Sequence, residues 1–477
     1  MIFEERQIEK NNFSIRATLL FGLMILGLIA VLLRVFSLQI SGYTDYQLAA
    51  LNNKNYPVPV QSLRGEIFDR NGKALIKNEP TYDLITRPNL IDDINSFLEK
   101  IQPVIFLSEN EISNYKKLQK EKAFDNKELV LKKDLSAEEI ARFNVRSFNF
   151  QHAFIAQRYR RISDYPEIFS HVLGYTSRIE NDIKSMPEIP QSHWKDTELV
   201  YAHGLIEGKT GLEQIYDDHL SGQHGQRVYE MNAKGQFVQS LSFTQPAKGL
   251  DLYTSLDIDA QKSAAKFLGN RKGAVVAIDL ESGGINVLYS SPTYSINQLS
   301  NGMSENNFQT LLNDPDKPFF NRALQGRYPP ASTIKPAIGM YGLSNNIVNW
   351  DFEMKDPGFF TLPETGRVFR GWRKGGHGKV NMHKAFLVSS NTYFFSLAYQ
   401  ADIEELSNHL SSLGFGNKVC LDCFEEDPAF VPTPEWKYSI MNAGWVKGDT
   451  VNLGIGQGYL VATPMQLANY AALLATK

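Results

Sequence analysis

Cysteine is almost absent from this sequence, in which Cys420 and Cys423 are the only two among 477 residues. A single C-x-x-C pair, with no second pair elsewhere, does not fit the usual zinc pattern, and its surroundings lack a thioredoxin-like context. Redox catalysis is therefore not expected. The pair predicts either a disulfide within one loop, which requires an oxidising compartment, or two unpaired thiols.

An excess of charge of either sign is also missing, because 49 Lys and Arg face 52 Asp and Glu, for a net charge of -3. Without an overall basic field, nucleic acid is not an expected partner. The short basic run RYRR at 158–161 is interpreted as a solvated face rather than a polyanion site. A hydrophobic content of 43% indicates a folded chain, whose length suggests two or three domains.

Long hydrophobic runs are scarce, and the membrane signal is confined to residues 17–33, which are apolar without a charge. At about 1.5 Å per residue, this run spans most of a roughly 30 Å hydrocarbon core. Arg34 can snorkel to the interface while the apolar residues after it extend the helix. We predict one transmembrane anchor over 17–38, preceded by a tail at 1–16.

Basic residues are unevenly placed around this anchor. Arg6, Lys10 and Arg16 precede it, whereas after Arg34 no Lys or Arg occurs before Lys54. The positive-inside rule therefore places the tail in the cytoplasm and the rest of the chain outside it. A cleaved signal peptide is the alternative, but the apolar run is long for one and no small-x-small cleavage site closes it.

The region from 39 to 249 carries structural signals and no catalytic constellation. The segment QSLRGEIFDRNGKALIKN alternates apolar and polar residues around Asn71 and Gly72, which predicts a hairpin. Two capping boxes, at Ser108 and Ser136, predict helix starts. The later K-T-G at 209–211 is predicted to open a helix and to be unrelated to catalysis.

A second domain is predicted from 250 to 477. The segment GLDLYTSLDIDAQKSAAKFL reads as a strand followed by a helix, and GAVVAIDLESGGINVLYSS reads as two strands joined by a turn at 281–284. Residues 301–318 are polar and are predicted to form a loop. The domain thus combines the start of a sheet with a predominantly helical continuation.

The most informative stretch of this second domain is YPPASTIKPAIGM, at 328–340. Ser332 and Lys335 are spaced as S-x-x-K, so the two side chains lie about one helical turn apart on the same face. A lysine whose pKa is lowered by burial can take the proton of a serine hydroxyl. At the start of a helix, free N–H groups would also favour an oxyanion at Ser332.

A second motif follows between two helix-like runs, where Ser389 and Asn391 form S-x-N. The order S-x-x-K then S-x-N is that of the serine penicillin-recognising enzymes. Together with RGEIFDRNG, GHGKVNMHKAFLVSSNTYFF and WVKGDTVNLGIGQGYLVATPMQLA, these motifs resemble the class B penicillin-binding proteins, most closely those of the elongation type. The resemblance runs from about Val58 to the last residue, with the blocks in family order.

This resemblance implies an α+β protein, with a single N-terminal transmembrane helix, a mixed α/β pedestal and a transpeptidase domain built from an antiparallel sheet and a helical lobe. It implies a serine-type peptidoglycan D,D-transpeptidase of cell-wall elongation and cell shape, held in the bacterial inner membrane with a periplasmic catalytic domain. The implied partners are stem peptides ending in D-Ala-D-Ala, β-lactams, a SEDS-type glycosyltransferase and elongation-complex proteins. No cofactor is implied.

The resemblance also assigns roles. Ser332 would attack the penultimate carbonyl of the stem peptide while Lys335 takes its proton. Ser389 would relay a proton to the leaving amine, and Asn391 would hold the peptide amide and Lys335. The backbone N–H of Ser332 would supply half an oxyanion hole.

Some relatives hold a zinc ion near this site with two aspartates, a histidine and a cysteine. The matching positions here are Asp356, Gly371, His377 and Ser390. Because two of the four ligands are replaced, no metal is expected. His377 is predicted to order the loop beside the active site.

One family motif does not occur, since no K-[ST]-G follows Asn391. In relatives this strand lines the active site and supplies the second oxyanion N–H, so the sequence is interpreted as truncated before the motif. Penicillin labelling of the chain is then expected to be negligible, and only the pedestal is expected to resist protease. Two other functions remain open: an inactive fragment or scaffold that activates the glycosyltransferase, and a β-lactam sensor or β-lactamase, against which the large pedestal argues.

Overall fold

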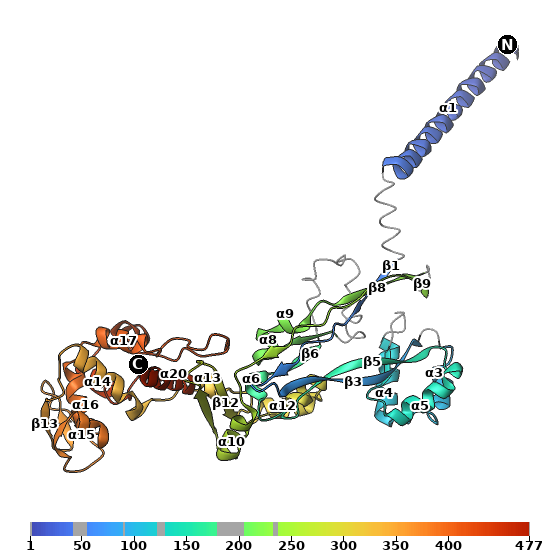
Figure 1. Ribbon diagram of the computed structural model, residues 1–477. Coiled ribbons are helices and arrows are strands. Elements are labelled where there is room, and N and C mark those ends of the chain that lie inside the picture. The colour runs from blue at the N-terminus through green and yellow to red at the C-terminus, as the bar shows by residue number, and fades with distance from the viewer. Residues whose placement is uncertain are drawn as a thin grey trace.

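The computed structural model describes residues 2–41, 55–88, 91–121, 129–178, 205–231 and 237–476. Its folded part is an elongated body of two units (Figure 1). The first, called here the pedestal, comprises the described residues from 55 to 253. The second comprises residues 254–476 and ends in a helical lobe.

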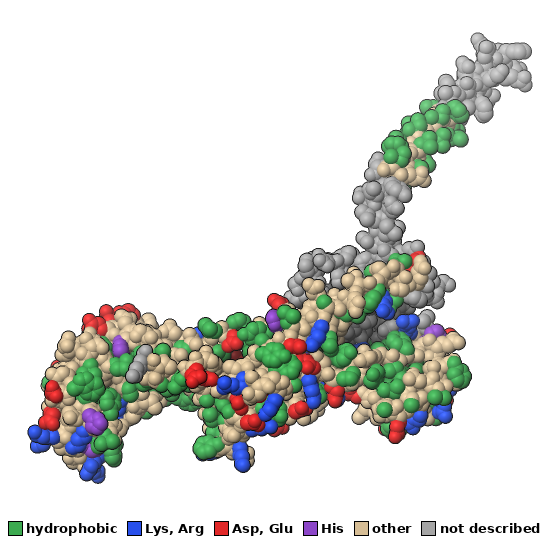
Figure 2. All heavy atoms as spheres, in the orientation of Figure 1, with side chains coloured by type: hydrophobic (Ala, Val, Ile, Leu, Met, Phe, Trp, Pro, Cys, Tyr) green, Lys and Arg blue, Asp and Glu red, His purple; other side chains and the backbone are tan. Residues whose placement is uncertain are grey.

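The chain begins with helix α1 (Ile2–Phe36), which continues as a short π-helix, η1 (Ser37–Ser41). Residues Leu19–Ile40 are long and apolar enough to cross a membrane, and hydrophobic side chains cover this stretch (Figure 2). Their large apolar side chains are exposed among the residues that the structure describes. The candidate span therefore overlaps the anchor predicted at 17–38.

The pedestal is built on two sheets. The strands of the first sheet lie in the order β1 (Asn55–Val60), β8 (Gly225–Met231), β9 (Phe237–Thr244). Those of the second lie in the order β10 (Leu252–Tyr253), β2 (Ile67–Phe68), β3 (Ala74–Thr86), β4 (Leu129–Lys132). Strand β5 (Ala153–Ile162) also pairs with β3. The predicted hairpin is confirmed, because β2 and β3 are antiparallel and Gly72 between them has a left-handed φ of 76°. The second sheet extends past the expected boundary at Gly249, since β10 pairs with β2.

Three helices cover one end of the second sheet. They are α3 (Ile94–Ile101), α4 (Glu109–Glu121) and α5 (Ala137–Arg146), the last followed by the 3-10 turn η3 (Ser147–Asn149). Both predicted capping boxes form, with Ser108 and Ser136 each bonded reciprocally to the glutamate three residues on. The helices enclose a core that includes Leu84, Ile101 and Phe143.

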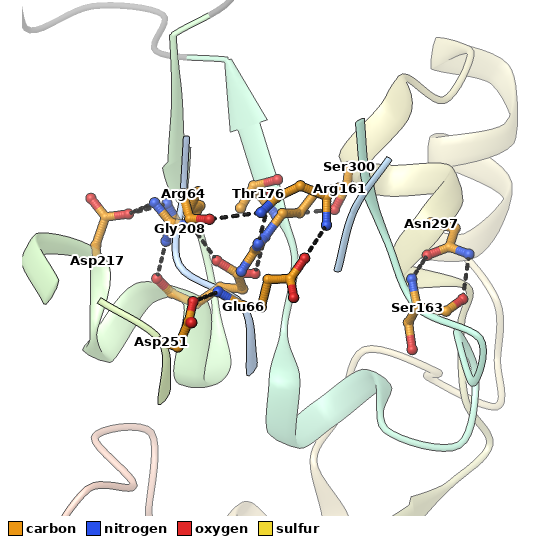
Figure 3. Close-up of polar contacts among 12 residues, drawn as sticks. Arg64, Glu66, Arg161, Ser163, Thr176, Gly208, Asp217, Asp251, Asn297 and Ser300 are labelled. Carbon is orange, nitrogen blue, oxygen red and sulfur yellow. Dashed lines mark hydrogen bonds and ion pairs between the residues drawn. The ribbon is translucent and has the colours of Figure 1, made fainter. Parts of the chain in front are cut away.

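A buried ion network joins three distant parts of the pedestal (Figure 3). Arg64 donates from Nε to Glu213 Oε2 at 2.7 Å, and Arg161 donates from Nε to Glu213 Oε1 at 2.9 Å. Glu213 follows the 209–211 K-T-G, which as predicted opens a helix, α8 (Gly211–Ile215). The interpretation of 158–161 as a solvated face is wrong for Arg161, which is buried because strand β5 points it at Glu213.

Short elements attach the pedestal to the second unit. Helix α11 (Ile296–Asn301) bonds to the pedestal from three positions: Asn297 exchanges two hydrogen bonds with Ser163, Ser300 Oγ accepts from Thr176 N at 3.1 Å, and Asn301 donates to Arg161 O. The other pedestal elements here are α6 (Ser170–Leu173), β6 (Thr176–Arg178), β7 (Ile206–Gly208) and α9 (Asp217–Ser221).

The second unit opens as the sequence predicts. Helix α10 (Ile258–Leu268), capped by Asp257, packs on the antiparallel pair β11 (Gly273–Ile278) and β12 (Ile285–Ser291). The predicted loop at 301–318 is wrong in part, because residues Glu305–Leu312 form helix α12. Ser304 caps this helix by accepting from Asn307 N, and Phe308 packs against the core beside Phe319. Five of its eight residues are polar, which is why the sequence favoured a loop.

The helical lobe forms the far end of the body (Figure 1). Its helices are α13 (Arg322–Gln325), α14 (Lys335–Ser344), α15 (Met382–Leu387), α16 (Asn391–Gln400), α17 (Ile403–Ser412), α18 (Pro434–Met441), α19 (Lys447–Leu453) and α20 (Pro464–Thr476). Two small ribbons flank them: β13 (Glu353–Asp356) with β16 (Gly378–Asn381), and β14 (Phe359–Thr361) with β15 (Val368–Arg370). A core around Ile338, Phe394 and Val451 joins most of these elements, whereas α13 packs in the core that includes β12 and part of the pedestal.

Cys420 and Cys423 form a disulfide, which decides between the two alternatives left by the sequence. The loop that they close lies against the pedestal. Cys423 packs in the same core cluster as Val172 and Leu212, and Tyr216 of the pedestal donates its hydroxyl to Asp422 at 2.9 Å.

Candidate active site

The predicted nucleophile lies in a tight turn just before helix α14. Residues Ala331–Ile334 form the 3-10 turn η6, and α14 follows with Pro336 in its first turn, where the missing N–H costs no hydrogen bond. Ser332 is exposed, whereas Lys335 is only 2% exposed. One turn of chain therefore presents a hydroxyl to solvent and sends an amine into the protein.

Lys335 is held by three acceptors from the S-x-N turn. Its Nζ donates to Ser389 O and Ser389 Oγ, both at 2.9 Å, and to Asn391 Oδ1 at 2.8 Å. The Nζ also lies 5.4 Å from the centroid of the Phe394 ring. Burial lowers the pKa of Lys335 to about 8, so a substantial share of the amine is neutral at mildly alkaline pH.

Ser389 connects the lysine to the nucleophile. Its hydroxyl donates to Ser332 Oγ at 3.1 Å while accepting from Lys335 Nζ. In the part of the chain that the structure describes, Ser332 and Lys335 are linked through this hydroxyl and not by a direct hydrogen bond. The sequence suggested direct transfer from Ser332 to Lys335 and gave Ser389 a role only at the leaving amine, because spacing cannot show which hydroxyl lies between.

Two residues of the site have left-handed backbones without being glycine. Ala331, directly before the nucleophile, has φ of 50°, and Ser389 has φ of 51°. Such conformations are costly for residues with a Cβ and persist where surrounding contacts enforce them. Both turns that carry the candidate catalytic hydroxyls are therefore held in place by their neighbours.

Gly456 supports the nucleophile turn from the IGQGY block and was not assigned a role from the sequence. Its carbonyl accepts from Ala331 N at 2.9 Å. A Cβ built on Gly456 would stand 2.2 Å from Ala331 O, and Gly456 itself has φ of 69°. Only glycine permits this close approach. The G-x-G pattern of the block was the signal that could have pointed to it.

The positions where some relatives hold zinc do not form a zinc site here. Asp356 and His377 are in contact, but Gly371 has no side chain, and Ser390 donates its hydroxyl to Asp356 Oδ2 at 2.7 Å. One carboxylate and one imidazole do not provide the four ligands of structural zinc. Within the described residues, the only other cluster of ligand atoms is at Cys420, Asp422 and Cys423, where the two thiols form the disulfide.

An exposed serine at the start of a helix, a buried lysine of lowered pKa and a hydroxyl bridging them define an enzyme that works through a serine ester. Family models agree: residues 59–254 match the penicillin-binding protein dimerisation domain, and residues 273–477 match the penicillin-binding protein transpeptidase domain. The chain belongs to the MrdA family of penicillin-binding proteins.

Individual relatives support this membership. The chain is 36% identical over 469 residues to the peptidoglycan D,D-transpeptidase MrdA of Acinetobacter baumannii, covering 98% of this chain and 68% of the relative. It is 34% identical to MrdA of Escherichia coli K12, covering 99% of this chain and 74% of the relative.

Solved structures agree with these relatives. A complex of PBP2 with MreC from Helicobacter pylori superposes with a TM-score of 0.74 at 30% identity, over 88% of this chain and 77% of that one. PBP2 of Pseudomonas aeruginosa in complex with WCK 5153 gives a TM-score of 0.64 at 30% identity, over 88% of this chain and 70% of that one.

Proposed function

We propose that this protein is a peptidoglycan D,D-transpeptidase of cell-wall elongation, which cross-links stem peptides through an ester on Ser332. The observation that carries the proposal is the hydroxyl of Ser389, bonded to Ser332 Oγ on one side and Lys335 Nζ on the other. These two hydrogen bonds give a proton a path from Ser332 Oγ to the buried amine of Lys335. The relatives are peptidoglycan D,D-transpeptidases, which supports peptidoglycan stem peptides as the substrate.

Acylation begins when Lys335 is neutral. Ser332 Oγ attacks the carbonyl carbon of the penultimate D-Ala, and its proton passes through Ser389 to Lys335 Nζ. The C–N bond to the terminal D-Ala then breaks, and the proton returns through Ser389 to the leaving amine. Asn391, which accepts from Lys335 at 2.8 Å, keeps the lysine aligned throughout.

The second half-reaction resolves the ester. The amine of a neighbouring stem peptide attacks the same carbonyl, loses a proton through Ser389 to Lys335, and forms a new amide bond as Ser332 Oγ leaves and is reprotonated. A penicillin follows only the first half, because opening its ring leaves the leaving group tethered in the site. The N–H of Ser332 contributes to the oxyanion site.

The membrane placement and the partner proteins that we propose are those of the same family. From the charge asymmetry around the apolar run, we place residues 17–38 across the bacterial inner membrane, residues 1–16 in the cytoplasm and the folded body outside. A SEDS-type glycosyltransferase and elongation-complex proteins are the proposed partners. A PBP2 of Helicobacter pylori solved with MreC, and a peptidoglycan synthase complex similar to this chain at a TM-score of 0.66 and 25% identity, support this assignment.

The test is covalent labelling, with a fluorescent penicillin, of a full-length form of the protein in its membrane, one that includes the K-[ST]-G strand of the family. Label is expected on the peptide that contains Ser332, and Ser332→Ala is expected to abolish it. Ser344→Ala is the matched control, because this exposed serine lies at the opposite end of α14 and should leave labelling unchanged. Labelling that survives in Ser332→Ala would contradict the assignment of the nucleophile.

A further inference from the structure

The turn that carries Ser389 is held on both sides by one segment, residues 356–377. On the C-terminal side, Ser390 is fully buried and donates its hydroxyl to Asp356 Oδ2 at 2.7 Å. The same hydroxyl accepts from Tyr393 N and so caps helix α16. The bond to Asp356 therefore fixes both the turn and the start of the helix that carries Asn391.

Asp356 is itself fixed by two further donors. His377 donates from Nδ1 to Asp356 Oδ2 at 2.8 Å, and Gly358 N donates to Oδ1 at 2.7 Å. The side chains of Asp356 and His377 are 1% and 5% exposed. With donors on both oxygens and little access for water, the carboxylate has one available orientation.

On the N-terminal side, Trp372 holds the residue before Ser389. Its indole Nε1 donates to Val388 O at 3.2 Å, and its ring lies 5.3 Å from the ring of His377, centroid to centroid. Trp372 and Asp356 thus form hydrogen bonds with the residues immediately before and after Ser389, and His377 contacts both of them.

These hydrogen bonds on both sides explain how Ser389 keeps its left-handed φ of 51°. A serine in this conformation returns to an ordinary one unless its neighbours prevent it. Release of the turn would move Ser389 Oγ out of the line between Ser332 and Lys335, and would also remove two of the three acceptors of Lys335 Nζ. A displacement of about 1 Å in such a site can cost roughly 10²-fold in rate.

We propose that Asp356, His377 and Trp372 are positioning residues that form a metal-free frame holding Ser389 in line between the nucleophile and the lysine. The proposal rests on the proposed acyl-enzyme function. It differs from the arrangement in relatives that hold zinc here, because hydrogen bonds centred on one carboxylate take the place of the ion. None of the three residues touches the reacting atoms.

The test compares the kinetics of penicillin acylation in Trp372→Phe and Asp356→Ala. Trp372→Phe keeps an aromatic ring but removes the donor to Val388 O, and since Trp372 is 64% exposed the protein should still fold. Trp350→Phe is the control, because Trp350 is 63% exposed and its indole has no hydrogen-bond partner among the described residues. Binding before acylation and the acylation rate constant are measured separately.

Trp372→Phe is expected to lower the acylation rate constant about threefold to tenfold, and Asp356→Ala to lower it by up to about 10²-fold. The dissociation constant of the non-covalent penicillin complex and the melting temperature of Trp372→Phe should stay at the wild-type values, as should all properties of Trp350→Phe. A weakened non-covalent complex with an unchanged rate constant would overturn the positioning role. Wild-type rates in both frame variants would overturn it too while leaving the proposed function intact.

Two further outcomes separate the proposals. A full-length wild-type protein, with the K-[ST]-G strand present, that is not acylated at all would overturn the proposed function and the frame with it. Metal analysis of the purified wild-type protein is expected to find no stoichiometric zinc, and a chelator should not change the acylation rate. Zinc bound at one ion per chain and lost in Asp356→Ala would overturn the metal-free frame.

Discussion

At the scale of single residues, the site depends on one amine that is poised between its charged and neutral forms. In the charged form Lys335 Nζ donates to all three of its acceptors, whereas in the neutral form it has a lone pair for the proton of a hydroxyl. Burial lowers the pKa to about 8, which makes both forms available.

The rate of acylation should therefore depend on pH in a defined direction. With the neutral amine as the proposed base, the rate should rise about tenfold per pH unit below pH 8 and level off above it. Stopped-flow acylation between pH 6 and pH 9.5 measures this profile. A rate that falls as the pH rises through 8 would mean that the charged amine is the reactive form.

Removal of the amine gives an independent measurement. Lys335→Ala should slow acylation by about 10²-fold or more, since no other base contacts the bridging hydroxyl of Ser389 among the described residues. The control is Lys379→Ala, an exposed lysine on β16 whose side chain is 83% exposed. Lys335→Ala with a wild-type rate would assign the base to another group.

Gly456 tests the support of the nucleophile turn. Gly456→Ala would place a methyl group against Ala331 O, so the turn must shift and acylation should slow by about tenfold or more. Gly444→Ala is the control, because a Cβ at Gly444 meets nothing within 4 Å. Equal rates for the two variants would show that the close approach is relieved without moving Ser332.

At the scale of elements, the sequence predicted those whose signals are local. The capping boxes, the hairpin at Gly72, the helix after Asp257 and the two runs on either side of the S-x-N turn all form. Helix α12 was missed because it is short and most of its residues are polar, although its Phe308 packs against the core. The burial of Arg161 could not be seen because its partner, Glu213, lies 52 positions away.

The buried network offers a stability prediction for the pedestal. Glu213→Ala would remove the buried carboxylate that Arg64 and Arg161 share and leave Arg64 with only the partly exposed Asp217, which should destabilise the protein by about 3–5 kcal/mol. Glu207→Ala is the matched control, since it breaks a half-exposed pair with Lys209 in the same segment and should cost about 0–1 kcal/mol. Denaturant unfolding of the two variants measures the difference, and similar midpoints would contradict the structural role of the network.

At the scale of the whole molecule, motif order was enough to predict the family, and the apolar run at 17–33 was enough to predict a helix long enough to cross a membrane. The sequence could not supply the hydrogen bond between Ser389 and Ser332, on which the proposed route of the proton depends, because it requires that the turns at these two residues meet. Two left-handed residues set that meeting, and spacing alone gives no sign of them.

Orientation in the membrane is a prediction for the entire chain. A reporter that is active only outside the cytoplasm should be active when it is fused after Lys477, and the protein should remain in membranes through a high-salt wash. Activity of the opposite reporter would reverse the orientation. Release into the soluble fraction without the first helix would favour a cleaved signal peptide.

The disulfide loop links the compartment in which the protein matures to the packing of its two units. The bond between Cys420 and Cys423 closes the loop whose Asp422 and Cys423 lie against the pedestal. Such bonds form in oxidising compartments and are rare in the cytosol. A chain retained in the cytoplasm would thus lack the closed loop, and its two units would dock less firmly. In the orientation proposed above, export is thus also the maturation step after which the loop fastens the second unit to the pedestal.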